Sequence, residues 1–218
     1  SGGRHLTALV TRQSTSASHV YAAGAFTNIA PANSRGYLAA FNGDGSISAW
    51  NPGAAGGTPS ALTLGAGVVY TGGSFTFAGG QNRTRFAALV DAAGGTGYAT
   101  ALNVQADNQV RALAWLPNGT LALGGSFFSL SSPASGSQSR GNAGAIDVAS
   151  GTITAFAPSA NGVVAAIAAD AESVYLAGNF SVLGGSTRYS LGAVDLNGAL
   201  QGWNPSNTNP LNYNALLV

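Results

Sequence analysis

Hydrophobic and polar residues alternate along short stretches of this chain, and glycine-rich turns separate the stretches. In the first 50 residues such stretches lie at 6–10, 20–21 and 37–42, and the large apolar residue Trp50 follows them. Alternation with a period of two is typical of strands that bury one face. The same order returns about every 50 residues, a period found in repeat proteins. The pattern therefore predicts a repeated unit of four short strands.

A Gly-x-Phe motif marks the second strand of each unit. Its aromatic residues are Phe26, Phe75, Phe127 and Phe180. Glycines just before the aromatic residue indicate that another backbone approaches this strand closely. We predict one array over residues 4–218, with units at 6–57, 58–108, 109–162 and 163–210 and the opening strand of a fifth at 211–218.

A large apolar residue, five positions after a glycine, lies near the end of each unit. These residues are Trp50, Leu102, Phe156 and Trp203. We predict that Trp50 and Trp203 are core residues between sheets, since burying a tryptophan removes roughly 150–250 Å² from water. Leu102 predicts weaker packing in the second unit, with Tyr98 compensating. An Xaa-Pro pair ends three of the four units, and proline cannot continue a strand.

Four strands in about 50 residues match one blade of a β-propeller. We therefore predict an all-β, propeller-like array of four-stranded antiparallel blades, with four full repeats and the first strand of a fifth. A helix at 163–171 is favoured by alanine propensity, but the equivalent positions hold Thr, Ser, Pro and Val. The extra strand leaves two alternatives, a segment of a larger propeller or pairing with another copy of the chain.

Charge is scarce: only 7% of the 218 residues are charged and the formal net charge is +1. All basic residues are arginine, which excludes lysine Schiff-base chemistry, and the low charge argues against nucleic-acid binding. Cysteine is absent, so we expect no disulfide and no thiolate metal site. No apolar stretch reaches the roughly 20 residues that span a bilayer. The absence of methionine suggests a processed product or a segment of a larger protein.

One arginine recurs in every unit, as Arg35, Arg83, Arg140 and Arg188. A ring of arginines is suited to binding an anionic glycan or a carboxylate. The favoured interpretation is structural, because a residue present in every blade generally braces the blade. The brace would be an ion pair with the Asn or Asp that follows seven or eight residues later, or stacking on an aromatic ring.

No catalytic or metal-binding constellation is found. His5 and His19 have no partners at metal or triad spacing, and we expect them on the surface. The segment 42–45 resembles a calcium loop but lacks the later glutamate, so a hairpin turn is expected. We predict no catalytic residue, no metal and no cofactor.

The third unit departs from the regular spacing. Its Gly-x-Phe phenylalanine and repeat arginine are 13 residues apart, against eight or nine in the other units, because of an insertion within 128–139. Arg111 and Trp115, four apart and so expected on one strand face, join Phe128 as candidate ligand-binding residues for a sugar or peptide. The alternative, which we favour, is a loop-length variant with a packed tryptophan.

The whole repeat resembles the bacterial delta-sixty repeat, which is similar to repeats of fungal Rax-type cortical markers. The resemblance rests on residues 69–75, Gly79-Gly80 and Arg83, and on their fourth-unit counterparts, and covers residues 4–218. Departures are Ala23, Ala177, Ala30-Pro31, Asn42 and Leu102. The resemblance implies a propeller-like protein, usually secreted or surface-attached, with no shared catalytic residues.

Two functions are compatible with these features. The favoured hypothesis is a non-catalytic extracellular or cell-surface propeller for adhesion, scaffolding or assembly. The alternative is a carbohydrate-binding or carbohydrate-active propeller domain. The expected partners are a protein or glycan at a surface, or other copies of the chain.

Overall fold

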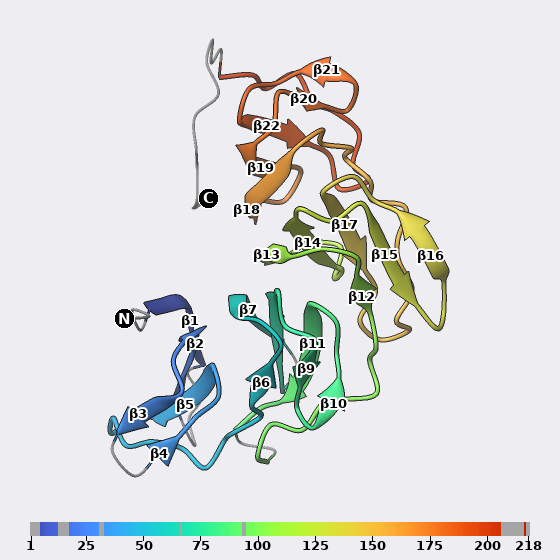
Figure 1. Cartoon of the computed structure of the whole chain (residues 1–218). Coiled ribbons are helices and arrows are strands. Elements are labelled where there is room, and N and C mark those ends of the chain that lie inside the picture. The colour runs from blue at the N-terminus through green and yellow to red at the C-terminus, as the bar shows by residue number, and fades with distance from the viewer. Residues whose placement is uncertain are drawn as a thin grey trace. The chain divides into compact units, whose positions relative to one another are not determined.

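The computed structural model describes residues 5–12, 18–30, 33–65, 67–92, 95–205 and 216. Over these residues the chain is all-β: strands β1 to β22 and no helix. The strands form small antiparallel sheets that follow one another along the chain (Figure 1). Two compact units contain them, Ser1–Asn103 and Val104–Val218. Each unit holds two of the four predicted repeats.

In the first unit each repeat forms a three-stranded main sheet. The first repeat supplies β1 (His5–Arg12), β2 (His19–Ala25) and β5 (Leu38–Asn42). The second repeat supplies β7 (Pro59–Gly65), β8 (Val68–Gly73) and β11 (Phe86–Val90). β2 and β8 are the central strands, so the strand that carries the Gly-x-Phe motif pairs on both sides.

The second unit repeats this arrangement. Its main sheets are β13 (Val110–Trp115), β14 (Leu121–Gly125) and β17 (Ala143–Ile146), and β18 (Val163–Ala169), β19 (Val174–Asn179) and β22 (Leu191–Val194). β18 occupies the segment whose alanines favour a helix. The first three predicted strands of every unit are thus confirmed.

The fourth predicted strand is wrong in all four repeats. After the hairpin turn the chain touches its main sheet through one isolated bridge. The bridges are Phe41–Ile47, Leu89–Ala99, Ile146–Ile153 and Val194–Leu200. The chain then leaves the sheet: the N–H of Asn51, for example, donates to the carbonyl of Thr96 in the next repeat, at 2.8 Å. Each main sheet therefore has three strands rather than four.

Each repeat also has a small side sheet that the sequence pattern did not predict. In the first unit the side sheets contain β3 (Asn28–Ala30) and β4 (Asn33–Ser34), then β6 (Ala54–Ala55), β9 (Phe77–Ala78) and β10 (Gln81–Asn82). In the second unit they contain β12 (Gln105–Ala106), β15 (Ser129–Ser132) and β16 (Gly136–Ser139), then β20 (Val182–Leu183) and β21 (Ser186–Thr187). Most of these strands are only two residues long, too short to show a period.

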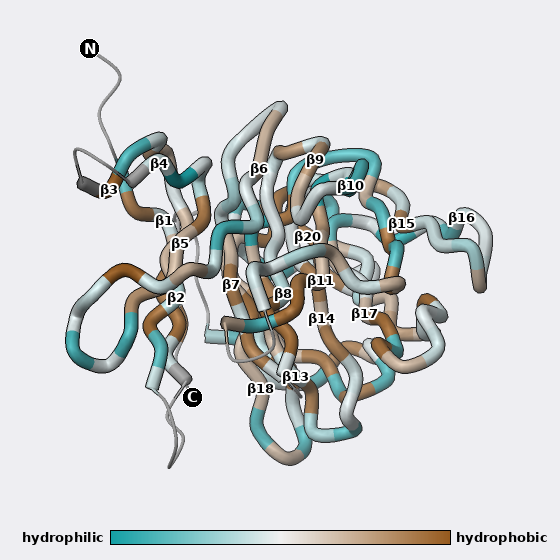
Figure 2. The backbone as a smooth tube through the Cα atoms, turned by 90° about the horizontal axis from the view of Figure 1, so that it is seen from below, coloured by the Kyte–Doolittle hydropathy of each residue, from teal (hydrophilic) through white to brown (hydrophobic). Residues whose placement is uncertain are grey.

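Each unit has its own core, which includes the facing sides of its two main sheets. Hydrophobic residues follow the main-sheet strands, and hydrophilic stretches lie in the connecting loops (Figure 2). In the first unit the core contains Trp50, Phe75 and Leu89, and in the second it contains Phe156 and Phe180. All four phenylalanines of the Gly-x-Phe motif are buried.

The division between the units follows the second repeat, where Leu102 stands in place of a large aromatic residue and no Xaa-Pro pair follows. Tyr98 does not compensate by burial, because 57% of its surface is exposed. The predicted fifth-unit strand at 211–218 lies outside the described residues except for Leu216.

Candidate functional site

The glycine of each Gly-x-Phe motif lies against a β-bulge in the first strand of its repeat; these glycines are Gly24, Gly73, Gly125 and Gly178. The bulges fall between Leu6 and Ala8, Pro59 and Ala61, Val110 and Ala112, and Val164 and Ala166. A Cβ on Gly178 would lie 2.0 Å from the carbonyl oxygen of Val163, and one on Gly73 would lie 2.4 Å from that of Thr58. The close backbone approach predicted from the motif is confirmed, and this glycine is structural.

Two residues after each repeat arginine, the chain adopts a left-handed conformation without glycine. These residues are Tyr37, Arg85, Asn142 and Ser190, with φ between 62° and 66°. Each donates its N–H to the carbonyl of the motif phenylalanine, and its own carbonyl accepts a hydrogen bond from the N–H of the motif glycine. These positions could not be predicted from the sequence, because glycine is the residue that normally signals a positive φ.

The four repeat arginines hold their own repeats together. Each guanidinium donates from Nη1 to the carbonyl of the preceding residue and from Nη2 to a carbonyl 13 to 17 residues later. For Arg83 these acceptors are Asn82, at 3.0 Å, and Thr100, at 2.8 Å. Burial lowers the pKa of Arg83 and Arg140. The brace is therefore made to carbonyls, whereas an ion pair or ring stacking was predicted.

Aspartate carboxylates accept hydrogen bonds from backbone N–H groups of their own turns. Backbone N–H groups donate to Asp147 and Asp195, and those of Glu172 and Ser173 donate to Asp170. Because these bonds favour the charged carboxylate, backbone donors lower the pKa of Asp147 and Asp170. The segment 42–45 forms the hairpin turn expected there, with the carboxylate of Asp44 accepting from Ser46.

The two histidines differ from one another. His5 is exposed, as predicted, but His19 is buried, with 7% of its surface exposed, so the surface prediction is wrong for it. His19 begins the central strand β2, and its ring centroid lies 6.1 Å from that of Tyr21. Among the described residues, no three His, Cys, Asp or Glu side chains gather to hold a metal ion, and no helix is long and apolar enough to cross a membrane.

The candidate ligand-binding residues of the third repeat are spread along its first strand and the segment after the Gly-x-Phe motif. The β-bulge between Val110 and Ala112 interrupts the alternation at Arg111, so a spacing of four no longer fixes whether Arg111 and Trp115 share a face. Trp115 pairs with Leu121 at one end of the sheet, whereas Val110 pairs with Gly125 at the end nearest Phe128. At about 3.3 Å per residue these two ends of β13 are about 16 Å apart.

Phe128 and the insertion form a longer version of an ordinary side sheet. β15 and β16 pair over four residues each, where β9 and β10 pair over two. Asp107 accepts hydrogen bonds from the N–H groups of Phe128, at 2.9 Å, and Ser129, at 3.2 Å. The Phe128 side chain remains 67% exposed. The insertion is thus an ordered hairpin beside an exposed aromatic residue.

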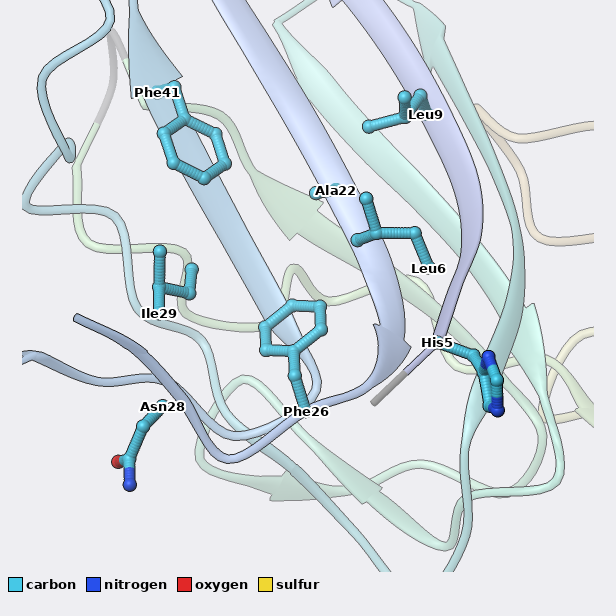
Figure 3. A pocket seen from close by; sticks show the side chains of 8 residues that line it. All are labelled: His5, Leu6, Leu9, Ala22, Phe26, Asn28, Ile29 and Phe41. Atoms are coloured by element: carbon cyan, nitrogen blue, oxygen red, sulfur yellow. The ribbon is translucent and has the colours of Figure 1, made fainter. Parts of the chain in front are cut away.

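An apolar hollow, which was not predicted from the sequence, lies on the first main sheet. It has a volume of about 290 Å³ and is lined by His5, Leu6, Leu9, Ala22, Phe26, Asn28, Ile29 and Phe41. In Figure 3 the Leu6, Leu9, Phe26 and Phe41 side chains stand over the same side of the sheet, with His5 and Asn28 at the margins. Leu6 and Leu9 are 61% and 60% exposed.

In the second and fourth repeats the same side of the main sheet is a packing surface. We call the side that packs on the preceding repeat the leading face and the opposite side the trailing face. The register aligns Leu6 and Leu9 with Val164 and Ile167 of the fourth repeat. Val164 and Ile167 are 0% and 8% exposed, in a core shared with the third repeat. The hollow therefore lies on the leading face of the first repeat.

In the second unit, Trp203 lies on the trailing face of the fourth repeat. Its ring makes an edge-to-face contact with Tyr175, with centroids 5.3 Å apart, just as Trp50 contacts Tyr21 at 5.1 Å. Trp50 is fully buried, but Trp203 is 44% exposed. The prediction of a buried core residue is correct for Trp50 and wrong for Trp203.

Comparison with known proteins gives information on the fold and none on the function. No family model matches the chain, and no curated protein matches it. A crystal structure of the computationally designed Ika8 protein is similar, with a TM-score of 0.54 and 13% sequence identity. The alignment covers 98% of this chain and 65% of that chain. This likeness concerns the fold alone, and this chain spans about two thirds of the length of the designed one.

Proposed function

We propose that this chain is a non-catalytic, propeller-type repeat protein that serves adhesion, scaffolding or assembly outside the cell or at its surface. The observation that carries the proposal is the exposed apolar leading face of the first repeat, which contains Leu6 and Leu9. Contiguous apolar surface of this kind is typical of a protein contact. The resemblance to delta-sixty repeats supports the propeller arrangement and the surface location.

The polar side chains support the same proposal. Recognition of an anion by Arg35, Arg83, Arg140 and Arg188 would compete with the carbonyl bonds that each makes within its own repeat. Asp147, Asp170 and Asp195 likewise accept from their own turns. A general acid or base has to face a substrate, and these groups face the backbone instead.

A carbohydrate-binding role is the second candidate, and a specific observation favours it. Phe128 exposes an aromatic ring beside the extended hairpin of the third repeat, and Arg111 is exposed at the same end of that repeat's main sheet. Aromatic rings that present a flat apolar face suit the stacking of sugars. This site would use Phe128 and Arg111, with Trp115 at the other end of the sheet.

A glycan array separates the two candidates. The wild-type chain is compared with Trp115→Ala and Phe128→Ala, and the release of reducing sugar from polysaccharides is followed in parallel. We expect no glycan binding that depends on either aromatic residue, and no turnover. Strong binding that is lost in Phe128→Ala or Trp115→Ala would replace the scaffold proposal with the carbohydrate-binding one. Turnover would show that the chain is an enzyme.

A further inference from the structure

Six residues of the first repeat's trailing face have identical counterparts in the fourth repeat, whereas Val10, which also packs on that core, aligns with Ala168. The register aligns Ala8, Tyr21, Ala23, Leu38, Ala40 and Trp50 with Ala166, Tyr175, Ala177, Leu191, Ala193 and Trp203. All six pairs are identical in residue type. In the first repeat this face packs against the second repeat and shares a core with Val69, Phe75 and Leu89. The fourth repeat thus carries a surface whose binding partner is known from within the same chain.

The partner of such a face is a leading face of branched and aromatic residues. In the second repeat it includes Leu62, Phe75 and Leu89, and in the fourth it includes Ile167, Phe180 and Val194. The first repeat has Leu9, Phe26 and Phe41 at the same three positions. The trailing face combines three alanines with a tyrosine, a leucine and a tryptophan, and in the first unit it shares one core with the branched and aromatic residues of the leading face. The two kinds of face can therefore pack at the density of a protein core.

Polar contacts accompany this packing where both faces are present. The indole Nε1–H of Trp50 donates to the carbonyl of Val90, at 2.7 Å, and the N–H of Ala92 donates to the hydroxyl of Tyr21, at 3.0 Å. Val90 and Ala92 belong to the second repeat. Trp203 has the same indole group and Tyr175 the same hydroxyl, which here donates to Asp170 of its own repeat, at 3.0 Å.

We propose that the trailing face of the fourth repeat, centred on Trp203, binds the leading face of the first repeat, centred on Leu6 and Leu9, of a second copy of this chain. The contact is head to tail and repeats the packing between the repeats of each unit. Because the two faces differ, the interface is heterologous and each copy can bind two neighbours. The inference rests on the proposed function, of which assembly is one form.

Complementation between two variants tests the proposal. Leu6→Ser/Leu9→Ser removes the leading face and Trp203→Ser removes the trailing face. Phe128→Ser is the control, since Phe128 is 67% exposed, more than any of these three residues, but belongs to neither face. Sedimentation velocity and light scattering over a concentration series measure the mass. We expect the wild type and Phe128→Ser to self-associate, and each face variant to associate about tenfold more weakly or not at all. An equimolar mixture of the two face variants should form a dimer, because each retains the face that the other lacks.

Tryptophan fluorescence gives an independent readout. Trp50 is already buried, so a blue shift that accompanies association and is absent in Trp203→Ser reports the burial of Trp203. Circular dichroism of each variant shows whether the fold is retained. A variant that has lost its fold is replaced by Leu9→Asn or Trp203→His in the same mixing experiment.

Three outcomes would overturn the proposal. The first is a wild-type chain that stays monomeric at every concentration. Binding of the two faces to each other within one molecule would also give this result, and it would overturn the proposal as well. Trp203→Ser associates as strongly as the wild type, which would mean that leading faces pair with one another. The mixture of the two face variants fails to dimerise although both are folded. None of these outcomes depends on glycan binding or turnover, so failure of this inference and failure of the proposed function are distinguishable.

Discussion

The first and fourth repeats share a trailing face, yet their tryptophans have different environments. Trp50 and Trp203 each contact a tyrosine ring edge to face, at 82° and 85°. Trp50 is fully buried and donates a hydrogen bond to the next repeat, whereas Trp203 is 44% exposed. The aromatic pair is therefore formed within a repeat, and burial comes from the repeat that follows. A residue type that recurs in a repeat protein does not have the same energetic role in every copy.

The largest expected effect contrasts the two tryptophans directly. Trp50→Ala removes a fully buried side chain and should lower the free energy of unfolding by about 3–5 kcal/mol. Trp203→Ala removes a partly exposed one and should lower it by about 1 kcal/mol or less. Guanidinium unfolding at low protein concentration, where copies do not associate, measures both. Equal losses would contradict the difference in burial on which the comparison depends.

The close contact between the Gly-x-Phe glycine and the backbone at the start of the first strand should behave alike in both units, in contrast to the tryptophans. Gly73→Ala and Gly178→Ala each place a Cβ 2.4 Å or less from a backbone carbonyl oxygen, and we expect each to cost about 1–3 kcal/mol. Gly202→Ala is the matched control, because nothing lies within 4 Å of its added Cβ, and it should change stability by less than about 0.5 kcal/mol. An unchanged stability in Gly178→Ala would show that the backbone at Val163 can move away from the added Cβ.

The two tyrosine hydroxyls also differ, because that of Tyr21 bonds to the next repeat and that of Tyr175 bonds within its own repeat. Tyr21→Phe leaves the N–H of Ala92 without that acceptor and should cost about 1 kcal/mol. Tyr175→Phe removes a bond to Asp170 in the same repeat and should cost less. Hydrogen exchange at the amide of Ala92 is the specific measurement, and it should accelerate in Tyr21→Phe and remain unchanged in Tyr175→Phe. Unchanged exchange in both would contradict the contact between repeats.

The smallest effect is the pH dependence that Asp170 contributes in the fourth repeat. The N–H groups of Glu172 and Ser173, then Tyr175, lower the pKa of Asp170 from its ordinary value of 3.8. A lowered folded-state pKa stabilises the fold fully above that ordinary value, and the contribution is lost as the pH falls through the folded-state pKa. Asp170→Asn should therefore flatten the acid side of the stability profile below about pH 4. The Tyr21 hydroxyl bonds to an amide, which does not titrate here, so Tyr21→Phe should leave the profile unchanged. An unaltered acid slope in Asp170→Asn would contradict this assignment.

Much of the fold could be predicted from residue types alone. Alternation and β-branched residues indicate three strands in each repeat, and the Gly-x-Phe motif indicates a closely approached strand, because these features depend on local geometry. The side sheets could not be predicted, since two-residue strands carry no period. The bulge at Arg111 also interrupts the alternation along its strand, so the alternation does not fix the face of Arg111, and the ligand-binding role of Arg111 and Trp115 stays a prediction. A bulge is fixed by the glycine across the sheet, which sequence spacing along one strand does not reveal.

Residue types alone were sufficient to predict the repeat, three strands in each unit and a recurring arginine in every unit. Three features became known only from the three-dimensional structure. The arginines bind carbonyls, Tyr37 and its counterparts adopt a positive φ, and the side chains of Leu6, Leu9 and Trp203 are exposed. The physical reason is that strand formation follows from local residue preference, whereas burial depends on which sheet lies opposite. Trp50 and Trp203 have the same local sequence context, and only the packing of the second repeat against the first distinguishes them.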